Sequence, residues 1–299
     1  MSLLVVGSTA LDTLQTPFGK RKNILGGSAI YFSFSARAFG PVRLVSVVGR
    51  DFPGHYRRRL TSHNIDHTGL QIEPGKTFRW HGCYVGDMCS ARTISVHLNT
   101  FGSFRPVLPK KYQDTKYLFL ANGHPLTQES VLRQIKRPKL IFCDTMNYWI
   151  ENEPKALRQL LRRIDGLIVN NDEVRQLTGE VHIVKAAREL LKWGPKILII
   201  KKGEHGALLI TKNLFFAVPG YPIDIVRDPT GAGDSFAGGL MGYLARSDSL
   251  SVTNLKKALL YGTVMASFTI EKFGVDRLKQ ATFREATRRL RNLYCMMRV

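Results

Sequence analysis

Short apolar runs alternate with amphipathic stretches along most of this chain, and this alternation limits its fold more than any other feature. Six apolar runs predict strands, at 3–6, 42–48, 117–120, 140–143, 166–169 and 197–200. Stretches with helical spacing follow them, at 29–39, 52–63, 128–135, 153–163, 173–178 and 184–193. Repeated strand–helix units predict an α/β fold with a largely parallel sheet and helices on both faces. Ligands of such sheets bind at the carboxyl ends of the strands.

One region breaks this alternation. Between 70 and 104 the sequence has strand-like stretches at 77–85 and 93–98, with turn residues between them and no helical pattern. Together with residues near 15–24, this region predicts a small β extension that covers a site as a lid. We therefore expect a single domain over residues 1–299, with lid segments inserted at approximately 13–25 and 70–105.

The chain is strongly basic, with 44 Lys and Arg against 23 Asp and Glu, a formal charge of +21. Such a charge favours anionic partners, which include nucleotides, phosphorylated metabolites and nucleic acids. The basic residues are spread along the chain in short runs within amphipathic stretches, as is typical of a solvated surface. No zinc-finger, RNA-recognition or helix-turn-helix pattern accompanies them, so a nucleic acid is not the expected partner.

Other features of the composition predict a cytoplasmic protein. No apolar run reaches the ~18 residues of a membrane span. Residues 1–7 lack the basic start and apolar stretch of a signal peptide. The four cysteines form no Cys-x-x-Cys pair, and no His cluster stands at zinc-ligand spacing, so reduced thiols are expected.

The strongest chemical signal is the string DPTGAGDSFAGG at 228–239. It follows 223–226, which predicts a short strand, and it leads into a helix predicted at 236–244. The backbone N–H groups of Gly231, Ala232 and Gly233 would converge at the positive end of that helix, which suits an anion such as a phosphoryl group. Asp234, in the first helical turn, can take a proton from an attacking hydroxyl.

This string resembles the C-terminal signature of the PfkB (ribokinase-like) carbohydrate kinases. The resemblance implies a three-layer αβα sandwich with a mainly parallel central sheet and a small β lid. It implies transfer of the γ-phosphate of ATP to a hydroxyl of a small sugar or sugar-like acceptor. Asp234 would be the general base, and the turn Gly231–Gly233 the anion hole. Asp228 would lie near the substrate or a monovalent-ion loop, although Pro229 departs from the commoner Thr.

Two N-terminal segments resemble the same family. Asp12, after the first predicted strand, matches the Asp that binds substrate hydroxyls, since a carboxylate accepts such hydrogen bonds well; a turn-capping Asp is the alternative. Gly26 and Gly27 match the pair that lets the backbone approach the substrate. Tyr31 stands where the family commonly has Asn, so an aromatic ring replaces an amide that reads hydroxyls. The nearby Phe34 is expected in the core.

The ATP and magnesium sites are also implied by matching residues. Lys201, Gly203 and Gly206 match the segment that lines the ATP site. Asn170 and Glu173 match Asn-x-x-Glu, whose Glu organises Mg²⁺ mostly through water, as suits a cation that keeps several waters. A helix start with acidic residues is the alternative for this pair. The residues expected at the ATP site are Lys201, Gly203, Gly206, Thr230 and Asn170.

The acceptor and the partners stay open at this stage. A sugar or sugar acid is the family's majority case. A nucleoside of the adenosine type is the alternative, because several aromatic residues could stack on a base; they are Tyr31, Phe32, Phe78, Trp80 and Phe101. The cofactors expected are ATP and Mg²⁺, with a monovalent cation as a further candidate. A homodimer through the lid is expected because lid strands expose pairing edges.

A different class of function is a non-catalytic, kinase-shaped protein that binds nucleic acid through its charge of +21. The retention of Asp234, the Gly231–Gly233 turn and Glu173 argues against it, because a protein without catalysis would be free to lose them. The Walker A pattern is absent from the sequence, which disfavours a P-loop kinase.

Overall fold

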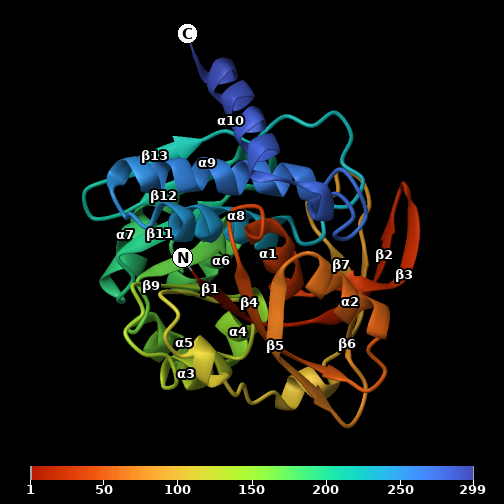
Figure 1. Cartoon of the computed structure of the whole chain (residues 1–299). Helices are drawn as coiled ribbons and strands as arrows, with labels where there is room; N and C mark the ends of the chain where they lie inside the picture. Colours follow the sequence, from red (N-terminus) through yellow and green to blue (C-terminus); the bar gives the residue numbers. More distant parts are fainter. Residues whose placement is uncertain (1, 299) are drawn as a thin grey trace.

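The large sheet of the computed structural model, which describes residues 2–298, has nine strands. They are β1 (Leu3–Val6), β4 (Val42–Gly49), β5 (Ile65–Glu73), β8 (Tyr117–Leu120), β9 (Leu140–Asp144), β10 (Gly166–Asn170), β11 (Ile197–Lys201), β12 (Ala207–Ile210) and β13 (Phe215–Val218). Their order is β13-β12-β11-β10-β9-β8-β1-β4-β5. Neighbours are parallel except β11–β12 and β12–β13, which are antiparallel. The predicted mainly parallel sheet is confirmed (Figure 1).

Helices cover both faces of this sheet. They are α1 (Ser28–Ala36), α2 (Gly54–Ser62), α3 (Pro125–Leu132), α4 (Asn147–Asn152), α5 (Pro154–Leu161), α6 (Asn171–Thr178), α7 (Ile183–Lys192), α8 (Ala232–Ser247), α9 (Val252–Thr269) and α10 (Phe283–Met297). Figure 1 shows α8 and α9 on one face and α3 and α5 on the other. Because successive side chains of a strand point to opposite faces, Leu3 and Val5 join one core cluster, and Leu4 and Val6 join the other.

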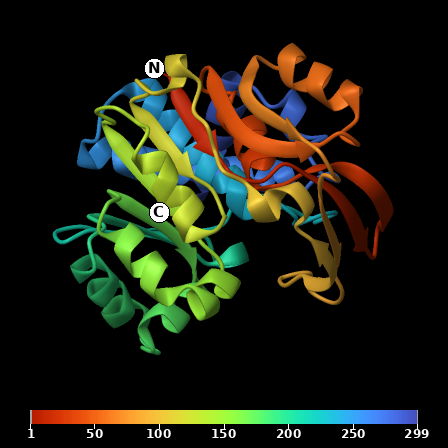
Figure 2. The same ribbon diagram turned by 90° about the horizontal axis from the view of Figure 1, so that it is seen from below.

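The lid is a separate four-stranded sheet that projects from one side of the sandwich (Figure 2). Its strands are β2 (Ala10–Thr16), β3 (Gly19–Gly26), β6 (Phe78–Cys83) and β7 (Arg92–His97), in the order β3-β2-β6-β7. β2 and β6 run parallel, and the outer pairs are antiparallel. Asp12 is in register with Trp80, and Trp80 with Val96, so these three side chains share one face of the lid.

Three local predictions need correction. No strand forms at 223–226, which lies between Pro222 and Pro229, and proline cannot donate to a ladder. The lid stretch begins later than residue 70, because β5 pairs with β4 in the large sheet as far as Glu73. That stretch also contains a 3₁₀ turn, Asn99–Ser103, where no helical pattern is evident in the sequence.

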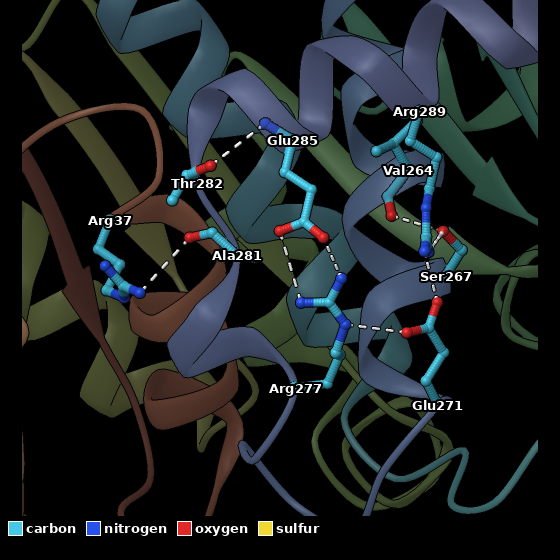
Figure 3. Close-up of polar contacts among 9 residues, drawn as sticks. All are labelled: Arg37, Val264, Ser267, Glu271, Arg277, Ala281, Thr282, Glu285 and Arg289. Atoms are coloured by element: carbon cyan, nitrogen blue, oxygen red, sulfur yellow. Dashed lines mark hydrogen bonds and ion pairs between the residues drawn. The ribbon is translucent and has the colours of Figure 1, made fainter.

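The end of α9 is joined to α10 by ion pairs that include two partly buried arginines (Figure 3). Arg277 pairs with Glu271, at 2.9 Å from Nε to Oε2, and with Glu285. Arg289 pairs with the other Glu271 oxygen and donates to Ser267 Oγ at 2.9 Å. This network fixes the segment between the two helices. That segment contacts the candidate active site described below.

Within residues 2–298, no helix is both long enough and apolar enough to cross a membrane.

Candidate active site

The turn at 228–234 forms because glycine stands at its one left-handed position. Gly231 has φ +74° and caps α8, which places Asp234 in the first turn of that helix. A Cβ on Gly231 would lie 2.2 Å from the Tyr31 ring, so the turn and the ring fit only with glycine there. The N–H groups of the first helical turn lack intrahelical partners and lie at the positive helix end. Of the expected anion-hole donors, Ala232 N–H donates to Pro229 O at 3.2 Å in this conformation.

Asp228 fixes this turn by accepting hydrogen bonds from two backbone N–H groups. Its Oδ1 accepts from the Thr230 N–H at 3.0 Å and its Oδ2 from the Gly274 N–H at 2.8 Å. The Arg227 N–H donates to Ile270 O at 2.8 Å, so hydrogen bonds hold the turn against the segment that follows α9. A direct contact between Asp228 and an acceptor or a monovalent ion stays a prediction.

Asp12 lies against the predicted glycine pair, and its contact with a substrate stays a prediction. A Cβ on Gly26 would lie 1.8 Å from the Asp12 Oδ2, so only glycine leaves room for this carboxyl. Gly27 has φ +97°, and its backbone N–H opposes the rise in the pKa of Asp12. Burial, together with the nearby charge of Asp228, raises the pKa of Asp12 to about 8. The Asp12 carboxyl is therefore buried among other carboxyl groups.

On the other side of the turn, one lysine faces a group of carboxylates. Asp144, at the end of β9, lies 3.6 Å from the Lys201 Nζ, at the end of β11. Burial alone would lower the pKa of Lys201, but the charges of Asp144 and Glu173 raise it above its usual value. Burial raises the pKa of Asp234 to about 7, with the Asp144 charge adding to that and Lys201 opposing it. A base with that pKa is suited to proton transfer near neutral pH.

Lys201 also lies beside the anion hole. A Cβ on Gly233 would be 3.1 Å from the Lys201 Nζ. The amine is therefore placed to neutralise an anion held at the Gly231–Gly233 turn. The Lys201 side chain is only 18% exposed, and its contact with a phosphate stays a prediction.

Asn170 and Glu173 form a capping box at the start of α6. The Asn170 side chain accepts from the N–H groups of Asp172 and Glu173, both at 2.8 Å, and Glu173 Oε2 accepts from the Asn170 N–H at 2.7 Å. The structural alternative for this pair is thus present. It does not exclude a role in the site, because Lys201 and Asp144 both act on the pKa of Glu173, which burial raises to about 7.

These donors fit magnesium in one particular way. Among residues 2–298, no group of three or more His, Cys, Asp and Glu side chains converges closely enough to hold a metal. Asp144 and Glu173 can offer carboxylate oxygens, and Mg²⁺ in such sites keeps several waters and binds substrate phosphates. The residues present therefore fit a magnesium ion that arrives with a nucleotide, held mainly through water.

The two glycines predicted at the ATP site shape the loop after β11. Gly203 has φ +58° and Gly206 has φ +88°. A Cβ on Gly206 would lie 2.0 Å from Val218 O, so the loop packs closely against the chain that leaves β13. Contact of this loop with ATP stays a prediction.

The aromatic residues after the glycine pair divide between site and core. Phe32 and Phe34 are fully buried, and Phe32 stacks on Phe119 at 4.5 Å, so neither is available to stack on a ligand. Tyr31 is buried beside the Gly231 turn, and the charges of Asp12 and Asp228 act on its hydroxyl.

Sequence reasoning did not find Tyr84. This residue follows β6, and its hydroxyl accepts from Thr230 Oγ1 at 3.2 Å. The Tyr84 N–H donates a hydrogen bond to Gln15 O of β2, at 2.8 Å. Thr16 Oγ1 adds a second link from the lid, to Arg227 O at 2.9 Å. No local pattern marks Tyr84, because its place in the site depends on how the lid lies over the turn.

Comparison with known proteins decides the family. The family model described as pfkB family carbohydrate kinase matches residues 10–281. This chain belongs to the pfkB family of carbohydrate kinases. The predicted family and the prediction of an enzyme are thereby confirmed.

Two relatives match most of this pfkB-family chain. A cytidine kinase of Thermococcus kodakarensis is 31% identical over 279 residues, which cover 92% of this chain and 98% of the relative. An aminoimidazole riboside kinase of Salmonella typhimurium is 41% identical over 273 residues, which cover 85% of this chain and 84% of the relative.

A solved structure confirms the predicted ribokinase-like fold. It is that of a nucleoside kinase of Methanocaldococcus jannaschii, which superposes with a TM-score of 0.80 at 23% identity, over 97% of this chain and 98% of that one.

Proposed function

We propose that this chain transfers the γ-phosphate of ATP to a hydroxyl of a small polyhydroxylated acceptor, with Asp234 as general base. The observation that carries this proposal is the position of Asp234. It lies in the first turn of α8, where the charges of Asp144, Lys201 and Glu173 act on its pKa. Its own charge in turn raises the pKa of Asp12. It thus stands between a carboxylate–lysine group and the predicted hydroxyl-binding carboxyl.

The remaining residues divide the work of phosphoryl transfer, which needs mainly positioning and neutralised charge. The Gly231–Gly233 turn and Lys201 would bind the transferring group. Asp144 and Glu173 would hold Mg²⁺ through water, and the bound ion would supply positive charge at the phosphates. Asp12 would orient the acceptor so that one hydroxyl faces Asp234. A family relative from E. coli, assigned as a ribokinase II, was solved with ATP and Mg²⁺, which supports this choice of cofactors.

A nucleoside is the acceptor class that specific observations favour over a simple sugar. The two relatives described above are named for cytidine and for aminoimidazole riboside. Trp80 shares the lid face of Asp12, is in register with it and is only partly buried. An aromatic ring beside a hydroxyl-binding carboxyl suits a ligand that joins a sugar to a flat base.

The lid also supports the proposal of a homodimer. β7 forms one edge of the lid sheet, and Ile94 and Val96 on it are both 52% exposed. An apolar strand with a free edge tends to pair with another strand. Sedimentation of the wild type should give a dimer, and Ser95→Pro, which places a proline in this edge strand, should give monomers. A wild-type monomer at all concentrations would contradict this part of the proposal.

The test of the catalytic proposal is ADP release with Mg·ATP across a panel of nucleosides, sugars and sugar acids. We expect turnover on at least one nucleoside and its loss in Asp234→Asn. Turnover on sugars alone would keep the kinase and reject the nucleoside. If no acceptor supports turnover and the protein instead shifts nucleic acid in a salt-sensitive gel assay, the proposal fails in favour of a binding protein.

A further inference from the structure

Two tyrosines enter the site without a part in the transfer described above. Tyr31 lies on α1 and is 1% exposed, whereas Tyr84 follows lid strand β6 and is 7% exposed. They come from different layers of the molecule, yet Asp12, Asp228 and Asp234 act on the pKa of both phenols, and Tyr84 acts on that of Tyr31. The two phenols therefore belong to one buried cluster.

The Tyr31 hydroxyl is buried and has no hydrogen-bond partner among residues 2–298. Its ring is fixed, because it packs against Gly231 at the start of α8. A buried polar group left without a partner destabilises a fold by about 1–3 kcal/mol, so native sites usually supply a partner. Since residues 2–298 offer none here, the position suits a bound ligand that accepts a hydrogen bond.

The Tyr84 hydroxyl has one hydrogen-bond partner and can form a further hydrogen bond. It accepts a hydrogen bond from Thr230 Oγ1, so its own proton is free to be donated. Burial and the nearby carboxylates raise the pKa of both phenols, which keeps their protons in place at neutral pH. Each tyrosine is thus a hydrogen-bond donor without an acceptor.

The rest of the cluster offers mainly acceptors. Both oxygens of Asp228 are already taken by backbone N–H groups, whereas Asp12 receives only the Gly27 N–H among the contacts that act on it. A ligand that satisfies this cluster must accept from two phenols and donate to one carboxyl. Neighbouring oxygens of a polyhydroxylated ring do both, because a hydroxyl donates and accepts.

We propose that Tyr31 and Tyr84 together read the oxygens of a ribose-like acceptor, and that this pair sets acceptor specificity where the family's usual amide is missing. This inference rests on the proposed kinase function. It adds that the lid contributes a recognition group, Tyr84, so the acceptor site is complete only when the lid lies on the Thr230 turn.

The test compares Tyr31→Phe and Tyr84→Phe with the wild type, using cytidine, ribose and the 2′-deoxy and 3′-deoxy analogues of cytidine. Each variant should raise the KM for cytidine or ribose about tenfold, the loss of one hydrogen bond, with kcat within about threefold. An analogue that lacks the oxygen read by one tyrosine should show no further loss in that variant, as in a double-mutant cycle. A merely structural tyrosine would weaken all acceptors equally.

Tyr117→Phe is the matched control. That hydroxyl donates to Asp248 Oδ1 at 2.7 Å. Tyr117 begins β8, so it lies at the amino ends of the parallel strands, whereas the site lies at their carboxyl ends. The control should leave every KM unchanged. Equal KM values in Tyr31→Phe, Tyr84→Phe and the wild type would overturn the inference while leaving the kinase intact.

Calorimetric binding to Asp234→Asn separates the two proposals. If the wild type turns over no acceptor but Asp234→Asn binds cytidine or ribose, and Tyr→Phe weakens that binding, the kinase proposal fails and the tyrosine inference stands. If neither cytidine nor ribose binds or turns over, the inference of a ribose-like acceptor is wrong.

Discussion

The site has two carboxylate groups that differ in how their charge is balanced. In the phosphate half, Asp144 and Glu173 face the buried amine of Lys201. In the acceptor half, Asp12 lies near Asp228 and Asp234, and its own burial together with these two charges favours its protonated form. Asp234 stands between the halves.

The difference fits two kinds of ligand. A nucleotide with Mg²⁺ is highly charged, so the half that receives it needs both a cation for the phosphates and carboxylates for the metal. A polyhydroxylated acceptor is neutral, so the other half can rely on hydrogen bonds. A carboxyl that is neutral before binding avoids an unpaired buried charge, which would be strongly destabilising.

The largest expected effect follows from removing the group that joins the halves. Asp234→Asn should lower kcat by about 10²–10⁴-fold, the range of general acid–base catalysis, with intact nucleotide binding. Asp224→Asn is a matched control in an exposed position shortly before the turn. Single-turnover measurement of ADP formation gives the rate of phosphoryl transfer in both variants. A fall of less than tenfold would mean that Asp234 is not the base.

The next effect comes from removing the cation of the phosphate half. Lys201→Met leaves buried carboxylates without their counter-charge, which typically destabilises by about 3–5 kcal/mol. Because Lys201 lowers the pKa of Asp234, its loss should move the acidic limb of the kcat/KM profile to higher pH. Activity lost at pH 7 should then return in part at pH 9. Lys202→Met, the neighbouring lysine, should show neither change.

The third expectation concerns the glycine turn on which both halves depend. Gly231→Ala requires a left-handed φ and displaces the Tyr31 ring, so it should lower stability by about 1–3 kcal/mol. Gly233→Ala meets only the flexible end of Lys201 and should change the free energy of unfolding by less than about 1 kcal/mol. Urea unfolding of both variants makes the comparison. Equal losses would mean that the turn tolerates no side chain at either position.

The last expectation concerns the pH dependence of stability. The pKa of Asp12 is about 8 in the fold against an ordinary value of 3.8. Between these values the folded state holds a proton that the unfolded chain has lost, so stability should fall as pH rises from about 4 to 8. The melting temperature should therefore be lower at pH 8.5 than at pH 5.5.

Asp12→Asn tests the origin of this slope. The amide cannot ionise, so the variant should show a smaller difference between the two pH values. It should not abolish the slope, because the pKa values of Asp234 and Glu173 are raised as well. An unchanged slope in Asp12→Asn would place the effect in the phosphate half instead.

Much of the fold follows from local patterns. The runs that become β1 and β8 are apolar at every position, as buried parallel strands require, and their predicted bounds agree with the structure. β12 and β13 are harder to predict, because a short antiparallel extension at a sheet edge is recognisable only once its neighbour is known. The proline-rich segment after β13 shows the opposite failure, since 223–226 is largely apolar but forms no strand.

The alternation of strands and helices, the lid region and the turn that carries Asp234 can all be inferred from the amino-acid sequence. These features are local, because glycine freedom, helix polarity and apolar runs act over a few residues. The tertiary structure alone decided that Lys201 faces Asp144, that Asp12 fits only against Gly26, and that Tyr84 reaches Thr230. Such contacts depend on the distance between distant segments, and that distance is set by packing rather than by any residue's own preference.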